Sequence, residues 1–302
     1  MDAMARTALR LPENVDGDLY VDSTCIDCDT CRQLAPAVFA RADAVEKSYV
    51  HRQPAAGEER TRALMALVAC PTASIGTVAK ADTAEAARRF PLDESGDVSF
   101  CGFTSKDSFG AWSWLVRRPT GNVLVDSPRA AGVLFDRIEA LGGVRTLFLT
   151  HSDDVADHAA IRKRFGCERV MHEADLSAET RDIERVIVGN DPVRLDDDLL
   201  VIPVPGHTAG SAALLHRDRD LFSGDHVWGT DDGTGLSASR SVCWHSWPEQ
   251  VRSIERLLAF RFERVLPGHG PVFRSASPAA ARDAVVALLV RVGRTAGYAT
   301  TE

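Results

Sequence analysis

Residues 150–158 read THSDDVADH, and three later stretches carry the same kinds of side chain: PGHTAGS at 205–211, SGDH at 223–226 and PGHG at 267–270. The first two follow apolar runs that predict strands. Loops that leave the ends of strands in an α/β sheet meet at one edge, so we expect these side chains to converge. Neutral imidazoles and carboxylates are the ligands that borderline divalent metals prefer. The sequence therefore predicts a metal centre at this edge.

The surrounding segments alternate between strand-like and helix-like patterns. The continuous apolar runs VRTLFLT at 144–150 and DLLVIPV at 198–204 are typical of strands covered on both faces. A pair of strands is expected at 111–117 and 122–126, and strands also at 18–22 and 47–51. Helices are expected at the following residues: 58–68, 129–141, 157–165, 248–260 and 278–291. This alternation favours an α/β fold with one large core of roughly 200 residues.

Four of the seven cysteines lie in the first quarter of the chain, in the pattern Cys25-x2-Cys28-x2-Cys31 with a remote Cys70 before Pro71. A short loop of this kind can bind three corners of an iron–sulfur cubane, and a fourth thiolate completes it. Residues 12–80 resemble a single-cluster 4Fe–4S ferredoxin, and we expect one such cluster here. The alternative is a structural zinc site with four cysteines, although zinc sites more often pair two C-x2-C knuckles.

Residues 98–275 resemble the metallo-β-lactamase superfamily, because GHTAGS and PGHG match its motifs in the right order. The resemblance implies a four-layer αββα sandwich with a metal pair. One metal would take His151, Asp153 and His207, the other Asp157, His158 and His269, and Asp225 would bridge them. The first motif departs from the family pattern: Asp157 and His158 come two residues late, and Asp153 stands where the family has its second histidine. Asp154 is an alternative to Asp153.

Composition limits the partners. The chain has 35 Lys plus Arg, 43 Asp plus Glu and a net charge of −8, which argues against nucleic-acid and anionic-membrane surfaces. No apolar run is long enough to span a membrane, and the start carries no apolar leader, so a cytoplasmic protein is expected. The charged segment 81–97 contains Pro91 and Gly96 and reads as a linker between a ferredoxin-like domain at 1–80 and a larger domain at 98–302.

Three functions fit these features. The first is a metal-dependent hydrolase of a small-molecule substrate, with one or two divalent ions, zinc first and iron or manganese as alternatives. In it, Asp157 would orient the nucleophile while remaining a metal ligand. The second is an oxidoreductase in which the 4Fe–4S cluster feeds electrons to a di-iron site; the oxygen ligand Asp153 in place of a histidine favours iron or manganese. The third is a non-enzymatic electron carrier or sensor. Either of the last two would need a redox partner protein.

Overall fold

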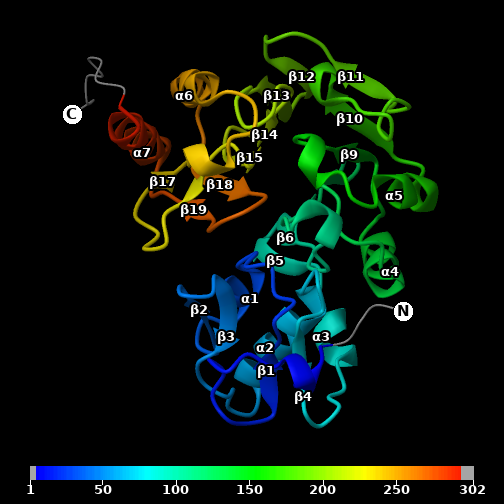
Figure 1. Ribbon diagram of the computed structural model, residues 1–302. Coiled ribbons are helices and arrows are strands. Elements are labelled where there is room, and N and C mark those ends of the chain that lie inside the picture. The colour runs from blue at the N-terminus through cyan, green and yellow to red at the C-terminus, as the bar shows by residue number, and fades with distance from the viewer. Residues whose placement is uncertain (1–4, 294–302) are drawn as a thin grey trace. The chain divides into compact units, whose positions relative to one another are not determined.

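The computed structural model describes residues 5–293, and the chain divides into two compact units (Figure 1). The first unit comprises Met1–Arg145 and Ala156–Cys167, and the second comprises Thr146–Val155 and Glu168–Glu302. Each unit is described separately. No helix within the described residues is both long and apolar enough to cross a membrane.

The early part of the first unit is a small α+β region. Strand β1 (Leu19–Val21) pairs antiparallel with β4 (Ile75–Thr77), and β2 (Phe39–Ala42) forms a hairpin with β3 (Lys47–Val50). In the sequence, helix α1 (Thr30–Leu34) lies between β1 and β2, and helix α2 (Glu58–Ala69) lies between β3 and β4. Helix α2 ends before the Cys70–Pro71 pair, as expected, because a residue that precedes proline disfavours the helical conformation.

Four further strands of the first unit pair antiparallel, each with the next one in the chain. These are β5 (Leu92–Ser95), β6 (Val98–Phe100), β7 (Trp114–Val116) and β8 (Val123–Val125). The unit also contains three helices: α3 (Ala84–Arg88), α4 (Gly132–Ala140) and α5 (His158–Phe165). Phe100 stacks on Trp112 with ring centroids 3.7 Å apart, and fully buried Phe90 packs edge-on to Phe100. Aromatic side chains therefore form much of this core.

Helix α3 and strand β5 lie within the polar segment 81–97 that the sequence indicates as a linker. Burial of Ala86 and Phe90 gives this segment its order, since both side chains pack in the core despite the charged residues around them. The boundaries 1–80, 81–97 and 98–302 stay a prediction.

The second unit contains two larger groups of strands. One is parallel: β9 (Thr146–Phe148), β10 (Glu168–His172) and β11 (Arg185–Ile187). The other is a mixed sheet of six strands, in the order β12 (Val193–Asp196), β13 (Leu199–Pro203), β14 (Ala212–His216), β15 (Asp220–Gly224), β18 (Arg264–Pro267) and β19 (Phe273–Arg274). Two short strands, β16 (Trp228–Gly229) and β17 (Leu236–Ser237), form a hairpin. The loops after β9, β13, β15 and β18 carry the side chains singled out in the sequence.

Helices α6 (Trp247–Arg256) and α7 (Pro278–Arg291) pack on the core of this mixed sheet (Figure 1). Each begins with a serine whose side chain accepts a backbone hydrogen bond, followed by a proline near the first helical position. Such caps satisfy main-chain donors that the helix itself cannot. The buried aliphatic residues that join helices and sheet include Ile202, Leu215, Val265, Ile254 and Leu288. This core fixes the strand ends from which the site is built.

Candidate metal centres

The four early thiols line one small cavity in the first unit. Cys25 and Cys28 lie in the loop before α1, Cys31 lies on α1, and Cys70 follows the end of α2. Val21 and Ile75, on the paired strands β1 and β4, complete the wall. A short local motif and one distant residue thus present four soft ligands to one space, the donor set of an iron–sulfur cluster.

The environment of these thiols fits a cluster. Burial, together with the neighbouring Cys70, raises the pKa of the Cys28 thiol to about 12. Burial likewise raises the pKa of Cys31 well above its ordinary value. Thiolates packed this closely repel one another unless iron cations compensate their charge, so cluster binding releases the thiol protons. Main-chain N–H groups of Asp27 and Ser74 donate to the sulfurs of Cys25 and Cys70, at 3.5 and 3.3 Å. Such bonds stabilise thiolate ligands.

Ion pairs brace the loop between the cysteines. Asp27 and Asp29 both adopt left-handed backbone conformations, with φ of 60° and 69°. Arg32 binds these two carboxylates at 2.7 and 2.6 Å, and Arg41 also reaches Asp27, at 2.8 Å. Gly110 leaves room beside the loop, since a Cβ there would lie 2.5 Å from the Cβ of Cys28. The aspartates therefore hold the loop conformation, a role that the cysteine spacing alone does not indicate.

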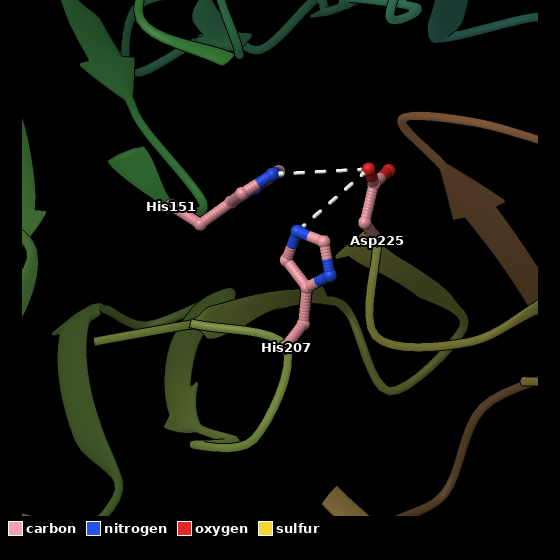
Figure 2. A group of neighbouring side chains, drawn as sticks. All are labelled: His151, His207 and Asp225. Atoms are coloured by element: carbon pink, nitrogen blue, oxygen red, sulfur yellow. Dashed lines mark ion pairs between the residues drawn. The ribbon is translucent and has the colours of Figure 1, made fainter. Parts of the chain in front are cut away.

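The second centre lies in the second unit, where imidazoles and carboxylates from four loops meet. His151 follows β9, His207 follows β13, and Asp225 comes directly after β15. Figure 2 shows these three side chains pointing toward one another. The Nε2 atoms of His151 and His207 each lie 3.9 Å from Oδ2 of Asp225. One donor atom from each residue lies within 4.8 Å of the others, close enough for one metal ion.

A second group of donors shares the same carboxylate. Asp154, Asp225 and His269 also bring one donor atom each within 4.8 Å of the others. Nδ1 of His269 lies 2.8 Å from Oδ2 of Asp225. A Cβ on Gly268 would lie 2.7 Å from Asp154 and 2.9 Å from Asp225, so only glycine lets the two carboxylates approach. Asp225 is thus common to both donor groups.

Hydrogen bonds orient both buried imidazoles for ligation. Nδ1 of His207 donates to the carbonyl oxygen of Val242 at 2.6 Å, which leaves the lone pair on Nε2. Nδ1 of His151 is 2.9 Å from Oγ1 of Thr150, and its buried Nε2 has no hydrogen-bond partner among the described residues. A cation between this nitrogen and the Asp225 carboxylate, 3.9 Å away, would satisfy both groups. This arrangement fits a divalent metal.

The charge states fit as well. Burial lowers the pKa of His151 to about 4, so its ring is neutral at pH 7. Burial would raise the pKa of Asp225, but His269, His151 and His207 outweigh it and hold that pKa well below its ordinary value. The contact with the His207 imidazole, at 3.4 Å, lowers the pKa of Asp153. A neutral imidazole and ionised carboxylates are the forms that bind metals.

The remaining predicted ligands take other positions. Oδ2 of Asp153 lies 3.4 Å from Nε2 of His207, on the side of the first donor group. Asp157 and His158, at the start of α5, belong to the first unit. There, Oδ2 of Asp157 accepts a hydrogen bond from the main-chain N–H of Ala130 at 2.6 Å, and His158 is buried. Their role as ligands stays a prediction.

Sequence reasoning missed Asp175, which joins the two histidine loops. This buried carboxylate accepts hydrogen bonds from the N–H of Ser152 at 2.9 Å, the N–H of Gly210 at 2.6 Å and the hydroxyl of Thr208 at 2.5 Å. It therefore positions His151 and His207 together. Its only signal in the sequence is a place just after strand β10, which was itself not predicted.

Two family models match the chain. Residues 21–77 match the 4Fe-4S single cluster domain of Ferredoxin I, and residues 98–285 match the metallo-β-lactamase superfamily. These matches imply an iron–sulfur cluster in the first region and divalent metal ions in the second.

Curated relatives match parts of the chain. The chain is 29% identical over 156 residues to a hydroxyacylglutathione hydrolase of Rhizobium etli, covering 50% of this chain and 58% of that protein. It is 31% identical over 127 residues to a hydroxyacylglutathione hydrolase of Cereibacter sphaeroides, covering 41% and 49%. A beta-lactamase-like protein 2 homolog of Drosophila melanogaster is 33% identical over 72 residues, covering 24% and 22%. The chain thus spans about half the length of the hydrolases it matches.

Solved structures give weaker matches. DIM-1 metallo-β-lactamase is 17% identical, with a TM-score of 0.49 over 65% of this chain and 95% of that chain. ETHE1 from Myxococcus xanthus is 19% identical, with a TM-score of 0.43 over 64% and 91%. The family assignment therefore rests on the family model, which spans well over half of the chain. The fold class expected from the sequence, an αββα sandwich preceded by a small α+β region, is confirmed. The chain belongs to the metallo-β-lactamase superfamily, and a single-cluster ferredoxin region precedes its metallo-β-lactamase domain.

Proposed function

We propose that the protein is a metal-dependent hydrolase that cleaves a thioester of a small thiol. The observation that carries this proposal is the Asp225 carboxylate, which is common to two groups of donor atoms. His151 and His207 complete the first group, and Asp154 and His269 complete the second. Two such groups around one carboxylate are the arrangement of a two-metal hydrolytic site.

The residues would act by holding and orienting. Divalent ions bound here supply a water of lowered pKa and polarise a carbonyl oxygen. Asp175 fixes the two histidine loops, so the Nε2 atoms of His151 and His207 keep their direction. A further carboxylate orients the attacking water. The family motif assigns that part to Asp157, whereas the grouping of donor atoms favours Asp154.

The substrate class comes from the relatives. Hydroxyacylglutathione is a thioester, and the hydrolases of that name resemble this chain at 29 to 31% identity. Hydrolysis adds water across the C–S bond and releases a carboxylic acid and a free thiol. Because the chain spans about half the length of those relatives, we propose the reaction class rather than the same acyl group.

Metal removal tests the proposal. Protein stripped of labile divalent metal by a chelator, with its cluster retained, should lose hydrolysis of a hydroxyacylglutathione, measured as release of free thiol. Zinc, iron or manganese added back should restore it, and the ion that does so identifies the working metal. Undiminished hydrolysis in stripped protein, or no thiol release with any of the three ions, contradicts the proposal.

One observation favours a second function. Three carboxylates lie in or beside the donor groups, those of Asp153, Asp154 and Asp225. Oxygen-rich ligand sets bind iron or manganese in preference to zinc. An iron site in a chain that also carries a ferredoxin-like region would support an oxidoreductase, in which the 4Fe–4S cluster passes electrons from a redox partner protein. Anaerobically purified protein with iron in this site, and turnover that requires a reduced cluster, would establish this function over the hydrolase.

A further inference from the structure

A large cavity of about 820 Å³ opens in the first unit, separate from the donor groups of the second unit. It adjoins the thiol-lined cavity, because Ile26 and Thr72 line both. Ile26 lies between two cysteines of the cluster motif, and Thr72 lies two residues after Cys70. A molecule in the large cavity would therefore contact the shell around the cluster.

The wall of this cavity combines cationic and apolar side chains. Arg6, Lys106 and Arg129 line it together with Phe103 and Ile26. The guanidinium of Arg129 lies over the ring of Phe103, 5.9 Å from its centroid. An apolar surface with a few placed polar groups is typical of small-molecule sites, and a volume of several hundred Å³ is the usual size.

Three carboxylates, those of Asp22, Asp107 and Asp157, also line the wall. Asp22 is buried and accepts the N–H groups of Arg6 and Thr24, each at 2.9 Å. Asp157 accepts the N–H of Ala130. By contrast, the side chains of Arg6 and Lys106 form no ion pair or hydrogen bond within residues 5–293. The cavity therefore offers cationic groups to an anion.

A chain of hydroxyl groups runs from this wall to a cluster thiol. Oγ1 of Thr72 lies 3.7 Å from Sγ of Cys70 and 2.6 Å from Oγ of Ser74. Oγ of Ser74 in turn lies 2.8 Å from Oγ1 of Thr24, which donates to Asp22. Thr24, Thr72 and Asp22 all line the cavity. The electrostatic effect of a charge bound there would thus reach the ligands of the cluster through these hydrogen bonds.

We propose that this cavity binds a small organic anion, an apolar body that carries a carboxylate or phosphate group, against the shell of the 4Fe–4S cluster. The anionic group pairs with Arg6, Lys106 and Arg129, and the apolar body contacts Ile26 and Phe103. The site lies within the first unit, and the side chains that would pair with the anion are not donors of the hydrolytic centre. The proposal therefore holds whether or not the protein hydrolyses thioesters.

Binding of simple probes to the cluster-loaded protein tests the site. Benzoate and phenyl phosphate should each bind saturably, with a dissociation constant of about a millimolar or below by calorimetry. Neutral benzamide should bind at least tenfold more weakly. The relative affinities of the two anions distinguish a carboxylate ligand from a phosphate ligand. Absence of saturable binding by both anions overturns the proposal.

Variants then place the bound anion. The double change Arg6→Gln with Lys106→Gln should weaken binding about tenfold, whereas Lys80→Gln, an exposed lysine outside the cavity, should not. Ala130→Phe should block the cavity. It keeps the main-chain N–H at position 130, which donates a hydrogen bond to Asp157. Bound anion should also shift the electron paramagnetic resonance spectrum of the reduced cluster. Affinity unchanged in both cavity variants, or an unshifted spectrum at saturation, means that the anion binds elsewhere.

Discussion

The thiol-lined cavity and the imidazole–carboxylate cluster use very different lengths of chain. Three of the four thiols come from the seven residues 25–31, and ion pairs of Arg32 hold that loop locally. The donors of the second centre come from residues 151–269 and lie on loops after strands of two sheets. The first centre therefore depends on a loop conformation, and the second depends on a packed core that fixes four strand ends.

The two centres also differ in charge before any metal binds. Burial raises the pKa of Cys28 and Cys31, so these thiols are protonated at pH 7. In the second centre, Asp225 is ionised and His151 is neutral. Cluster assembly must therefore displace protons, whereas His151 and Asp225 of the second centre are already in the form that binds metal. Each of the following variants changes one centre and leaves the other as an internal control.

The largest effect is expected from Cys28→Ser, which removes one of four ligands to the cluster. Anaerobically purified wild-type protein should contain about four irons at this site and absorb broadly in the visible range. The variant should lose that iron and absorbance while the second centre keeps its metal. Cys101→Ser, a buried thiol outside the motif, should retain both. A cluster that survives in Cys28→Ser would exclude Cys28 as a ligand.

Asp225→Asn should have the next largest effect, because it removes the carboxylate common to both donor groups. Changes to residues that merely support metal ligands cost 10- to 100-fold, so loss of this ligand should reduce hydrolysis by more than about a hundredfold. Elemental analysis should show loss of the divalent metal with the visible absorbance intact. Asp197→Asn, an exposed aspartate of the same unit, is the matched control. Full metal content in Asp225→Asn would contradict the bridging role.

A paired experiment decides between the two candidate carboxylates of the second group. Asp154→Asn should lose about one equivalent of metal, because its carboxylate lies within 4.8 Å of the Asp225 and His269 donors. Asp157→Asn should keep both metals, since the amide oxygen of asparagine can still accept the hydrogen bond from the N–H of Ala130. Metal content per protein is the measurement. The opposite result, metal loss only in Asp157→Asn, would support the assignment made from the family motif.

Local spacing and loop order explain what could be predicted from the sequence. The cysteine motif sets its geometry within one loop, so its ligands could be named directly. His151, His207 and His269 follow strands, and strand ends on one side of an α/β domain converge. The choice among Asp153, Asp154 and Asp157 could not be made, because it depends on how the short helical turn Ser152–Asp154 directs two adjacent carboxylates.

Other features depend on contacts distant in the sequence. Asp175 binds loops around residues 152 and 210, and no local pattern marks such a partner. Strands β6 and β10 are short, and neither stands out as a long apolar run. Phe90 is fully buried within a segment of mostly charged residues, which is why helix α3 and strand β5 were not predicted there. Tertiary packing decides these elements rather than local propensity.

The smallest effect is expected in the pH dependence of the free energy of unfolding, through the buried His226 next to Asp225. Burial lowers the pKa of His226 to about 3, whereas in the unfolded chain it has an ordinary value of about 6.5. Between these values only the unfolded chain binds the proton, so the free energy of unfolding falls as the pH falls from about 6.5 toward 3, by up to about 1.4 kcal/mol per pH unit. In metal-stripped protein, His226→Gln should reduce the slope of the free energy of unfolding against pH by the contribution of about one proton. Denaturant unfolding at several pH values measures this slope. Equal slopes for wild type and His226→Gln would mean that the ring of His226 reaches water in the folded protein.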